Sequence, residues 1–447
     1  MLPRATPSGL LVDLYQFTMM QAYLEAGMAE TACFEFFARK LPPNRAFYVA
    51  AGLEQALDYL DDLAFEEAEL DWLASTGEFG RDFIDHLAGF RFTGDVHAMP
   101  EGTVFFPDEP ILRVTAPLPQ AQFVETRLIN LLHFQTVIAA KAARMVLAAD
   151  GRLLVDYGLR RAHGEEAGLL AARAAYLAGF TGTATVGASR LFDIPAFGTM
   201  AHSFIQAHDD EVMAFRHFAR ARPQKLVLLI DTYDTIEGAR RVARLAPELA
   251  DQGIEVTGVR LDSGDLVELS KAVRDVLDEA GLENVRVLAS GGIDEVKIAR
   301  LAAEGAPIDG FGVGTSLTTA SDAPALDCAY KLQEYAGLAR RKRSSGKATW
   351  PGRKQVYRWF DENGRMLRDL LTVEEDRQDG TALVEPVMAA GERLAPSPGL
   401  EDVRAHAARQ VATLPEGLRR LEDADAYPVE VSGPLRDLAD EVDRRTL

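Results

Sequence analysis

Residues 225–235 read Lys-Leu-Val-Leu-Leu-Ile-Asp-Thr-Tyr-Asp-Thr. The apolar run 225–231 ends in an aspartate, polar residues follow at once, and helical sequence comes next. This order is typical of a strand and helix unit in a parallel sheet, where functional side chains lie at the carboxyl end of the strand. The same order recurs through the middle of the chain, so it decides the predicted fold class.

Other apolar segments between residues 150 and 320 also end in polar or glycine-rich sequence and alternate with helical stretches. The expected strands are 153–156, 225–231, 254–261, 285–289 and 310–313, with weaker ones at 184–186 and 195–200. A doubly wound sheet also places ligands at strand ends, but at its switch point. Because nearly every strand end here carries functional residue types, the pattern favours an irregular α/β barrel.

The length of 447 residues allows two or three domains, and a hydrophobic share of 47% with 26% charged residues is typical of a soluble globular protein. We expect an N-terminal α+β domain at residues 1–134 and the barrel at 135–340. Residues 341–447 are expected to form a C-terminal segment that packs on the N-terminal domain.

The net charge of −20 argues against binding to nucleic acid or to an anionic membrane. Only two cysteines are present, which is too few for a disulfide framework or a cysteine metal site. We find no signal peptide and no apolar run that reads as a membrane span, so the expected location is cytoplasmic. The basic run 341–354 is an exception in this acidic chain. It is either a solvated loop or a phosphate-binding segment.

His202 lies in the stretch 197–208, where its neighbours are mostly small or polar. A neutral imidazole is a nucleophile near pH 7 and can carry a covalent intermediate. A packed or capping histidine is the alternative interpretation.

Two glycine-rich strand ends have the composition of phosphate sites. Ser290-Gly291-Gly292 and the segment 312–316 each offer backbone N–H groups just before a predicted helix. A third strand end is the segment 260–265, Arg-Leu-Asp-Ser-Gly-Asp. Its carboxylates could hold ribose hydroxyls or a Mg²⁺ ion with its waters. Simple turns and helix caps are the alternatives.

Tyr157, Arg160 and Arg161 follow another expected strand. An aromatic ring and a guanidinium together would suit a flat aromatic acid, through stacking and charge pairing. A pair of surface arginines beside a half-buried tyrosine is the alternative.

Taken together, these segments resemble the nicotinate phosphoribosyltransferase family, in order, from about residue 10 to about residue 420. The matching segments are 13–19 (Asp-Leu-Tyr-Gln-Phe-Thr-Met), 156–161 (Asp-Tyr-Gly-Leu-Arg-Arg), 198–203 (Gly-Thr-Met-Ala-His-Ser), 261–265 (Leu-Asp-Ser-Gly-Asp), 311–315 (Phe-Gly-Val-Gly-Thr) and the basic run 342–354.

The resemblance implies a barrel of the type II phosphoribosyltransferase kind with a flanking α+β domain. It also implies a reaction in which nicotinate attacks the anomeric carbon of phosphoribosyl pyrophosphate, giving nicotinate mononucleotide and pyrophosphate, in NAD salvage. ATP hydrolysis would be coupled through a phosphohistidine at His202, with Asp231 orienting the imidazole and Mg²⁺ offsetting phosphate charge.

Residue roles follow from the resemblance in the same way. The implied catalytic residues are His202, Asp231 and Asp262. The implied substrate ligands are Tyr157, and Tyr15 from the second subunit of a homodimer, for the pyridine ring; Arg160 and Ser203 for the carboxylate; Arg260, Asp262 and Ser263 for ribose and pyrophosphate; and Gly291, Gly292, Gly312, Gly314 and Thr315 for the 5′-phosphate. Lys342, Lys347 and Lys354 are the implied ligands of ATP phosphates.

Two alternatives stay open from the sequence. Related nicotinamide phosphoribosyltransferases carry an aspartate where this chain has Ala184, and an aspartate there would repel the nicotinate carboxylate. The chain could also be a catalytically inactive homologue that only binds ligand, although His202, Asp231, Arg260 and Asp262 are all present.

Overall fold

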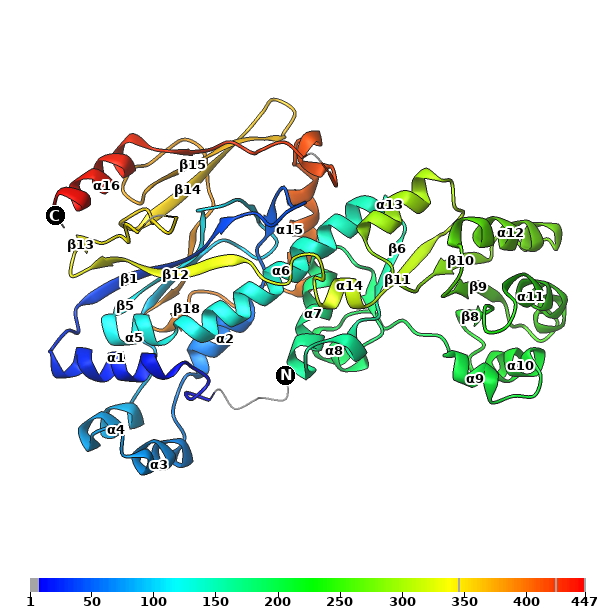
Figure 1. The fold of residues 1–447 in the computed structure, drawn as a ribbon, viewed down its shortest axis with the longest axis horizontal. Helices are drawn as coiled ribbons and strands as arrows, with labels where there is room; N and C mark the ends of the chain where they lie inside the picture. The colour runs from blue at the N-terminus through cyan, green and yellow to red at the C-terminus, as the bar shows by residue number, and fades with distance from the viewer. Residues whose placement is uncertain (1–7, 345, 423, 446–447) are drawn as a thin grey trace. The chain divides into compact units, whose positions relative to one another are not determined.

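The computed structural model describes residues 8–344, 346–422 and 424–445 (Figure 1). The chain divides into two compact units. Unit 1 contains residues 1–140 and 323–447, and unit 2 contains residues 141–322.

Unit 2 is built on one six-stranded sheet in the order β7-β6-β11-β10-β9-β8, with every neighbouring pair parallel. Its strands are β6 (Leu153–Asp156), β7 (Gly182–Thr183), β8 (Leu226–Leu229), β9 (Val256–Leu261), β10 (Arg286–Ala289) and β11 (Gly310–Val313). The sheet curls as a half-barrel, and its strands alternate with helices along the chain. The predicted barrel-type fold is confirmed, and all five main expected strands lie in this sheet.

The two weaker strand predictions were wrong in their bounds. The first strand is Gly182–Thr183 rather than 184–186, and in 195–200 only Ala196 forms a bridge, to Thr183. The Thr183 hydroxyl accepts a hydrogen bond from the Thr185 N–H at 3.0 Å, which turns the chain toward the next helix.

The helices of unit 2 begin where aspartates cap them. Asp210, Asp234, Asp265 and Asp294 each accept a backbone N–H in the first turn of α10, α11, α12 or α13, and such caps stabilise a helix by about 1 kcal/mol. Apolar faces then pack on the sheet, α11 on β9 and α12 on β10. The helices are α7 (Glu165–Leu177), α8 (Val186–Phe192), α9 (His202–Gln206), α10 (Glu211–Ala221), α11 (Thr235–Ala250), α12 (Leu266–Glu279), α13 (Glu295–Ala303) and α14 (Thr315–Thr318).

Unit 1 joins segments from both ends of the chain in one antiparallel sheet of order β13-β12-β1-β5-β3-β17-β18. A second sheet, β16-β14-β15-β19, and a two-stranded ribbon, β2-β4, complete it. Its strands are β1 (Thr31–Lys40), β2 (Tyr48–Val49), β3 (Asp95–Ala98), β4 (Val104–Phe105), β5 (Pro110–Pro117), β12 (Asp327–Tyr335), β13 (Leu338–Ala339), β14 (Lys354–Phe360), β15 (Met366–Val373), β16 (Thr381–Ala382), β17 (Glu385–Ala389), β18 (Glu392–Arg393) and β19 (Val429–Val431).

The helices of unit 1 come mainly from the N-terminal part of the chain. They are α1 (Leu14–Glu25), α2 (Leu53–Asp62), α3 (Glu67–Thr76), α4 (Arg81–Ala88), α5 (Leu118–Phe123), α15 (Leu400–Ala412) and α16 (Gly433–Arg445). Helix α6 (Glu125–Ala149) runs through the division at residue 140. Among the described residues it alone is long and apolar enough to cross a membrane, but 72% of its most apolar window is buried, as in the core helix of a folded domain.

Candidate active site

The functional residues predicted in unit 2 gather where its strands end. Parallel strands present their carboxyl ends at one edge of the sheet. Asp156 is the last residue of β6, and Asp262, Ser290 and Gly314 directly follow β9, β10 and β11. Hydrogen bonds connect several of these strand ends.

Asp231 joins the end of β8 to the end of β9. Its Oδ2 accepts hydrogen bonds from the Asp262 N–H and the Ser263 hydroxyl, both at 2.7 Å. Its other oxygen, Oδ1, is buried and has no hydrogen-bond partner within the described residues. The helix that follows β9 is capped by Asp265, so capping does not account for Asp262 or Ser263.

The loops after β9 and β10 are in direct contact. The Ser290 hydroxyl donates to Asp262 Oδ1, and the Ser290 N–H donates to the Leu261 carbonyl at 2.8 Å. Gly291 has φ +85°, and a Cβ there would clash with the Asp262 carbonyl oxygen. Glycine at position 291 therefore permits this close approach.

His202 is the first residue of α9, and its ring is partly exposed. Its Nδ1 lies 3.1 Å from the Thr232 hydroxyl, and its Nε2 lies 3.9 Å from Asp262 Oδ2. Thr232 was not predicted as a site residue, although its place directly after Asp231 is a sequence signal. Within the described part of the chain, the hydrogen bonds of Asp231 go to the 262–263 segment, so direct orientation of His202 by Asp231 stays a prediction.

Arg260 ties β9 to the segment that precedes His202. Its Nη1 donates to the Thr199 hydroxyl at 2.7 Å, and its Nη2 donates to the Met200 carbonyl at 2.9 Å. Its guanidinium carbon also lies 5.9 Å from the centre of the Tyr157 ring, within range of a cation–π contact. Arg260 thus connects the histidine segment with the aromatic side chain after β6.

Tyr157 lies against Gly312 rather than over open space. A Cβ at position 312 would come within 2.5 Å of the Tyr157 ring, so glycine there makes room for the aromatic side chain. The preceding Asp156 accepts hydrogen bonds from the Thr183 hydroxyl at 2.7 Å and the Gly158 N–H at 2.8 Å. Burial raises the pKa of the Asp156 carboxyl, against the effect of both hydrogen bonds.

The remaining predicted residues of unit 2 lie after β6, β10 and β11 or in α9. Arg160, in a 3₁₀ turn, and Ser203, in α9, are exposed. Gly292, with φ +60°, has open space where a side chain would project. Gly314 and Thr315 lead from β11 into α14. These groups are accessible to a ligand.

Tyr15 and the predicted ATP-binding lysines belong to unit 1. Tyr15 lies in the first turn of α1 and is 44% exposed. Partial burial and the charges of Glu125 and Asp13 raise the pKa of its phenol. Lys342 and Lys347 are exposed.

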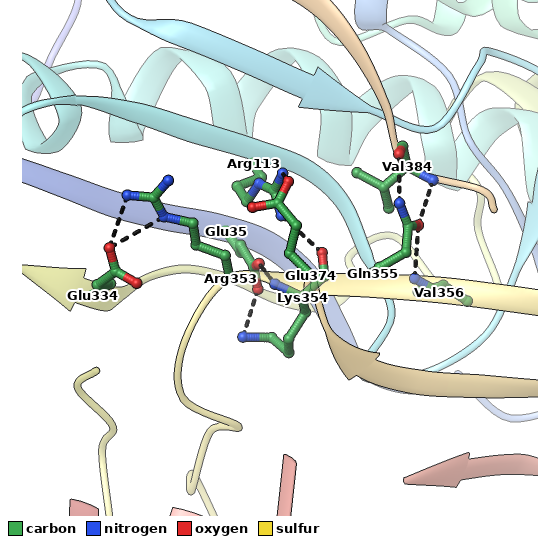
Figure 2. Close-up of polar contacts among 9 residues, drawn as sticks. All are labelled: Glu35, Arg113, Glu334, Arg353, Lys354, Gln355, Val356, Glu374 and Val384. Carbon is green, nitrogen blue, oxygen red and sulfur yellow. Dashed lines mark hydrogen bonds and ion pairs between the residues drawn. The ribbon is translucent and has the colours of Figure 1, made fainter. Parts of the chain in front are cut away.

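Lys354 differs from the other two lysines because it is buried. Figure 2 shows its ammonium beside Glu35, with Nζ at 2.7 Å from Oε2. The same ammonium donates to the carbonyls of Trp350 at 2.8 Å and Gly352 at 2.9 Å. Two of these contacts are hydrogen bonds and the third is an ion pair. They favour a structural role for Lys354, and its binding of ATP phosphate stays a prediction.

No cluster of three or more His, Cys, Asp and Glu side chains arranged to hold a metal occurs among the described residues. Mg²⁺ does not need such a cluster, since it is usually held by one or two carboxylates, waters and substrate phosphates. The unpartnered Oδ1 of Asp231 and the partly exposed carboxylate of Asp262 fit that mode of binding.

Three family models match the chain in order. They describe the nicotinate phosphoribosyltransferase N-terminal domain at residues 10–133, the nicotinate phosphoribosyltransferase family at 153–338 and its C-terminal domain at 377–439. The chain belongs to the nicotinate phosphoribosyltransferase family. Its activity is therefore that of an enzyme of pyridine nucleotide biosynthesis, and the predicted family and activity are confirmed.

Relatives match this family member over most of their length. A nicotinate phosphoribosyltransferase of Mycobacterium tuberculosis, pncB2, is 52% identical over 425 residues, covering 95% of this chain and 91% of its own. The Bacillus subtilis nicotinate phosphoribosyltransferase is 38% identical and covers 95% and 92%. The crystal structure of human nicotinic acid phosphoribosyltransferase superposes with a TM-score of 0.87 at 30% identity, covering 97% of this chain and 100% of its own.

Proposed function

We propose that this nicotinate phosphoribosyltransferase couples nicotinate mononucleotide synthesis to ATP through phosphorylation of His202. An imidazole nitrogen attacks the γ-phosphorus of ATP, the bond to the bridging oxygen breaks, and ADP leaves. Water later cleaves the N–P bond and releases phosphate. The observation that carries the proposal is the pairing of His202 Nδ1 with the Thr232 hydroxyl while Nε2 lies on the side of Asp262.

The Thr232 hydroxyl can accept a hydrogen bond from the Nδ1–H group of His202, because a hydroxyl is both donor and acceptor. In that tautomer Nε2 carries the lone pair and is the nucleophile. Asp231 acts through its two hydrogen bonds to the 262–263 segment, which hold Asp262 beside Nε2. The positive charge that develops on the imidazole is then stabilised by the nearby Asp262 carboxylate.

The other strand ends bind the two substrates of phosphoribosyl transfer. Tyr157 stacks on the pyridine ring of nicotinate, and the accessible Arg160 and Ser203 bind its carboxylate. The proposed ligands of phosphoribosyl pyrophosphate are Arg260, Asp262 and Ser263 for ribose and pyrophosphate, with Gly291, Gly292, Gly312, Gly314 and Thr315 for the 5′-phosphate. Asp231 and Asp262 would hold Mg²⁺, and the bound ion would neutralise phosphate charge.

The enzyme is proposed to act in the cytoplasm as a homodimer in which Tyr15 of one copy completes the site of the other. Exposed apolar side chains around the start of α1 support this assignment, and they are Leu11, Leu14, Tyr15 and Met19. The exposed Lys342 and Lys347 are the proposed ligands of ATP phosphates.

The central test is His202→Ala, assayed with nicotinate, phosphoribosyl pyrophosphate and ATP. We expect no phosphoenzyme by intact-mass analysis at neutral or alkaline pH, and ATP should no longer stimulate synthesis. Slow synthesis without ATP should remain. His208→Ala is the matched control, because His208 is paired with the Phe204 carbonyl and His217. ATP hydrolysis in proportion to product in His202→Ala would contradict the proposal.

A second test concerns the tautomer. Thr232→Val keeps the shape of the side chain but removes the hydroxyl, and we expect phosphorylation to slow about tenfold, the value of one hydrogen bond. Thr232→Ser should restore most of the rate. Rapid-quench measurement of phosphoenzyme formation distinguishes these variants, and equal rates in wild type and Thr232→Val would remove Thr232 from the proposal.

A further inference from the structure

One buried ammonium contacts the two segments that follow the glycine-rich loops of unit 2. Lys141, on α6, is buried, and its Nζ lies 2.6 Å from Glu295 Oε2 and 2.7 Å from Asp322 Oδ1. We propose that Lys141 is a positioning residue that fixes the loop after β10 and the loop after β11 relative to each other, and thereby sets affinity for phosphoribosyl pyrophosphate. The inference rests on the proposed function, in which these loops hold the 5′-phosphate.

Glu295 carries the contact to the loop after β10. It is the first residue of α13 and follows the helix cap Asp294, which accepts the Lys297 N–H at 2.8 Å. The Lys297 ammonium in turn donates to the Gly291 carbonyl at 3.0 Å. If Glu295 moves, the first turn of α13 moves with it, and the Lys297 contact then displaces the Gly291–Gly292 pair.

Asp322 carries the contact to the loop after β11. It comes four residues after α14, the helix that begins at Thr315. The same two loops also meet directly, because the Ser316 hydroxyl donates to the Ile293 carbonyl. Lys141 thus acts on a pair of segments that already contact each other.

The charges in this cluster show why Lys141 does more than neutralise Glu295. Glu295 also accepts a hydrogen bond from Arg144 Nε at 3.2 Å, so a cation remains beside it without Lys141. The Lys141 ammonium also pairs with Asp322, so it joins the two carboxylates. An ammonium is a compact charge with three donors, and it can bridge two carboxylates.

Lys141→Met removes the ammonium and keeps most of the aliphatic length. We expect the KM for phosphoribosyl pyrophosphate to rise about tenfold or more, because small displacements of a substrate-positioning group have effects of that size or larger. The KM for nicotinate and the phosphorylation of His202 should change less than about twofold. A merely structural role would lower the melting temperature without this split between the two substrates.

Arg274→Met is the matched control. Arg274 pairs with Asp278 and donates to the carbonyls of Val285 at 2.7 Å and Leu282 at 2.8 Å, at the end of β10 away from the glycine loop. Its loss should lower the melting temperature and leave the KM for phosphoribosyl pyrophosphate at the wild-type value.

The double variant Lys141→Met/Asp322→Asn provides a second test in case the single variant folds poorly. It removes the carboxylate charge that the Lys141 ammonium neutralised, so stability should recover while the KM for phosphoribosyl pyrophosphate stays raised. A wild-type KM in either Lys141 variant overturns the inference. Gly314→Val, which adds bulk in the loop itself, separates the two proposals. If it raises this KM and Lys141→Met does not, only the inference fails; if neither raises it, the phosphate assignment of the loops fails as well.

Discussion

The charged groups around Lys354 form close ion pairs, whereas His202 and its carboxylate neighbour lie farther apart. In unit 1, Lys354 pairs with Glu35, Arg113 with Glu374 and Arg353 with Glu334, and Figure 2 shows these contacts side by side. In unit 2, His202 is 3.9 Å from its nearest carboxylate, and Asp231 keeps a buried oxygen without a partner within the described residues.

This difference indicates which charged residues are available to bind a ligand. A group whose hydrogen bonds are already made is part of the structure, since binding a substrate would require breaking them. A buried group with an unused donor or acceptor is a candidate for ligand binding, because leaving it unpaired has a free-energy cost that a ligand removes. Sequence proximity to a basic run does not distinguish the two cases, as Lys354 shows.

A second buried cluster in unit 1 extends the comparison. Arg358 is fully buried and donates to both oxygens of Asp369, at 2.8 and 2.6 Å. The guanidinium also lies 5.7 Å from the centre of the Phe106 ring and 6.0 Å from that of Tyr427. Burial opposes its charge, but the hydrogen bonds and charge of Asp369 raise the pKa of Arg358.

The variant with the largest expected effect, Arg358→Met, tests whether the stability of unit 1 depends on buried ion pairs. Arg358→Met leaves the Asp369 carboxylate buried without its cation, and we expect a loss of about 3–5 kcal/mol in the free energy of unfolding. Urea denaturation measures it. The folded fraction should keep the wild-type KM for both substrates. A loss below about 1 kcal/mol would contradict a structural role for the Arg358 pair, since an exposed ion pair contributes that much to stability.

Gly312→Ala tests the crowded side of unit 2. The added methyl would lie within 2.5 Å of the Tyr157 ring and should displace it. We expect the KM for nicotinate to rise about tenfold, and overpacking of this kind lowers stability by about 1–3 kcal/mol. Steady-state kinetics with nicotinate varied measure this effect. Gly80→Ala is the control, because Gly80 has φ −66° and open space where the methyl would project. An unchanged nicotinate KM would remove the ring of Tyr157 from the nicotinate site.

Glu109→Gln tests a buried acid beside the Arg358 pair. Burial, followed by the charge of Asp369, raises the pKa of Glu109 well above its ordinary value of 4.5. The folded state therefore favours the protonated acid, so its contribution to stability is complete below pH 4.5 and is lost as the pH rises through the folded-state pKa.

Glutamine does not titrate, so Glu109→Gln should gain stability relative to wild type as the pH rises from 5 toward 8, by about 1.4 kcal/mol for each unit of pKa shift. Urea midpoints across this range provide the measurement. Parallel pH profiles for the two proteins would show that Glu109 does not titrate in this way.

The smallest expected effect concerns the exposed lysines. Lys342→Ala/Lys347→Ala should raise the KM for ATP about three- to tenfold, because each exposed ion pair contributes about 1 kcal/mol or less. The melting temperature should stay unchanged, in contrast to Lys354→Met, which should lower it by removing the partner of buried Glu35. A change in melting temperature without a change in ATP KM would place these lysines with the structural charges.

The sequence predicted the elements whose signals are local. Each of the five main strands is an apolar run with polar residues directly after it, and that pattern needs no distant partner to be recognised. The short strand at Gly182–Thr183 was misplaced, because two residues form too little pattern and because the bond from Thr185 to the Thr183 side chain decides where the strand ends.

The parallel sheet and the family follow from the sequence alone, since strand periodicity and ordered motifs lie in contiguous residues. The tertiary structure was needed to show that Thr232 contacts His202, that Lys354 pairs with Glu35, and that Lys141 contacts both Glu295 and Asp322. These pairings connect residues far apart in the chain. Burial and distance, which exist only after folding, determine whether a charged side chain supports the structure or is available to a substrate.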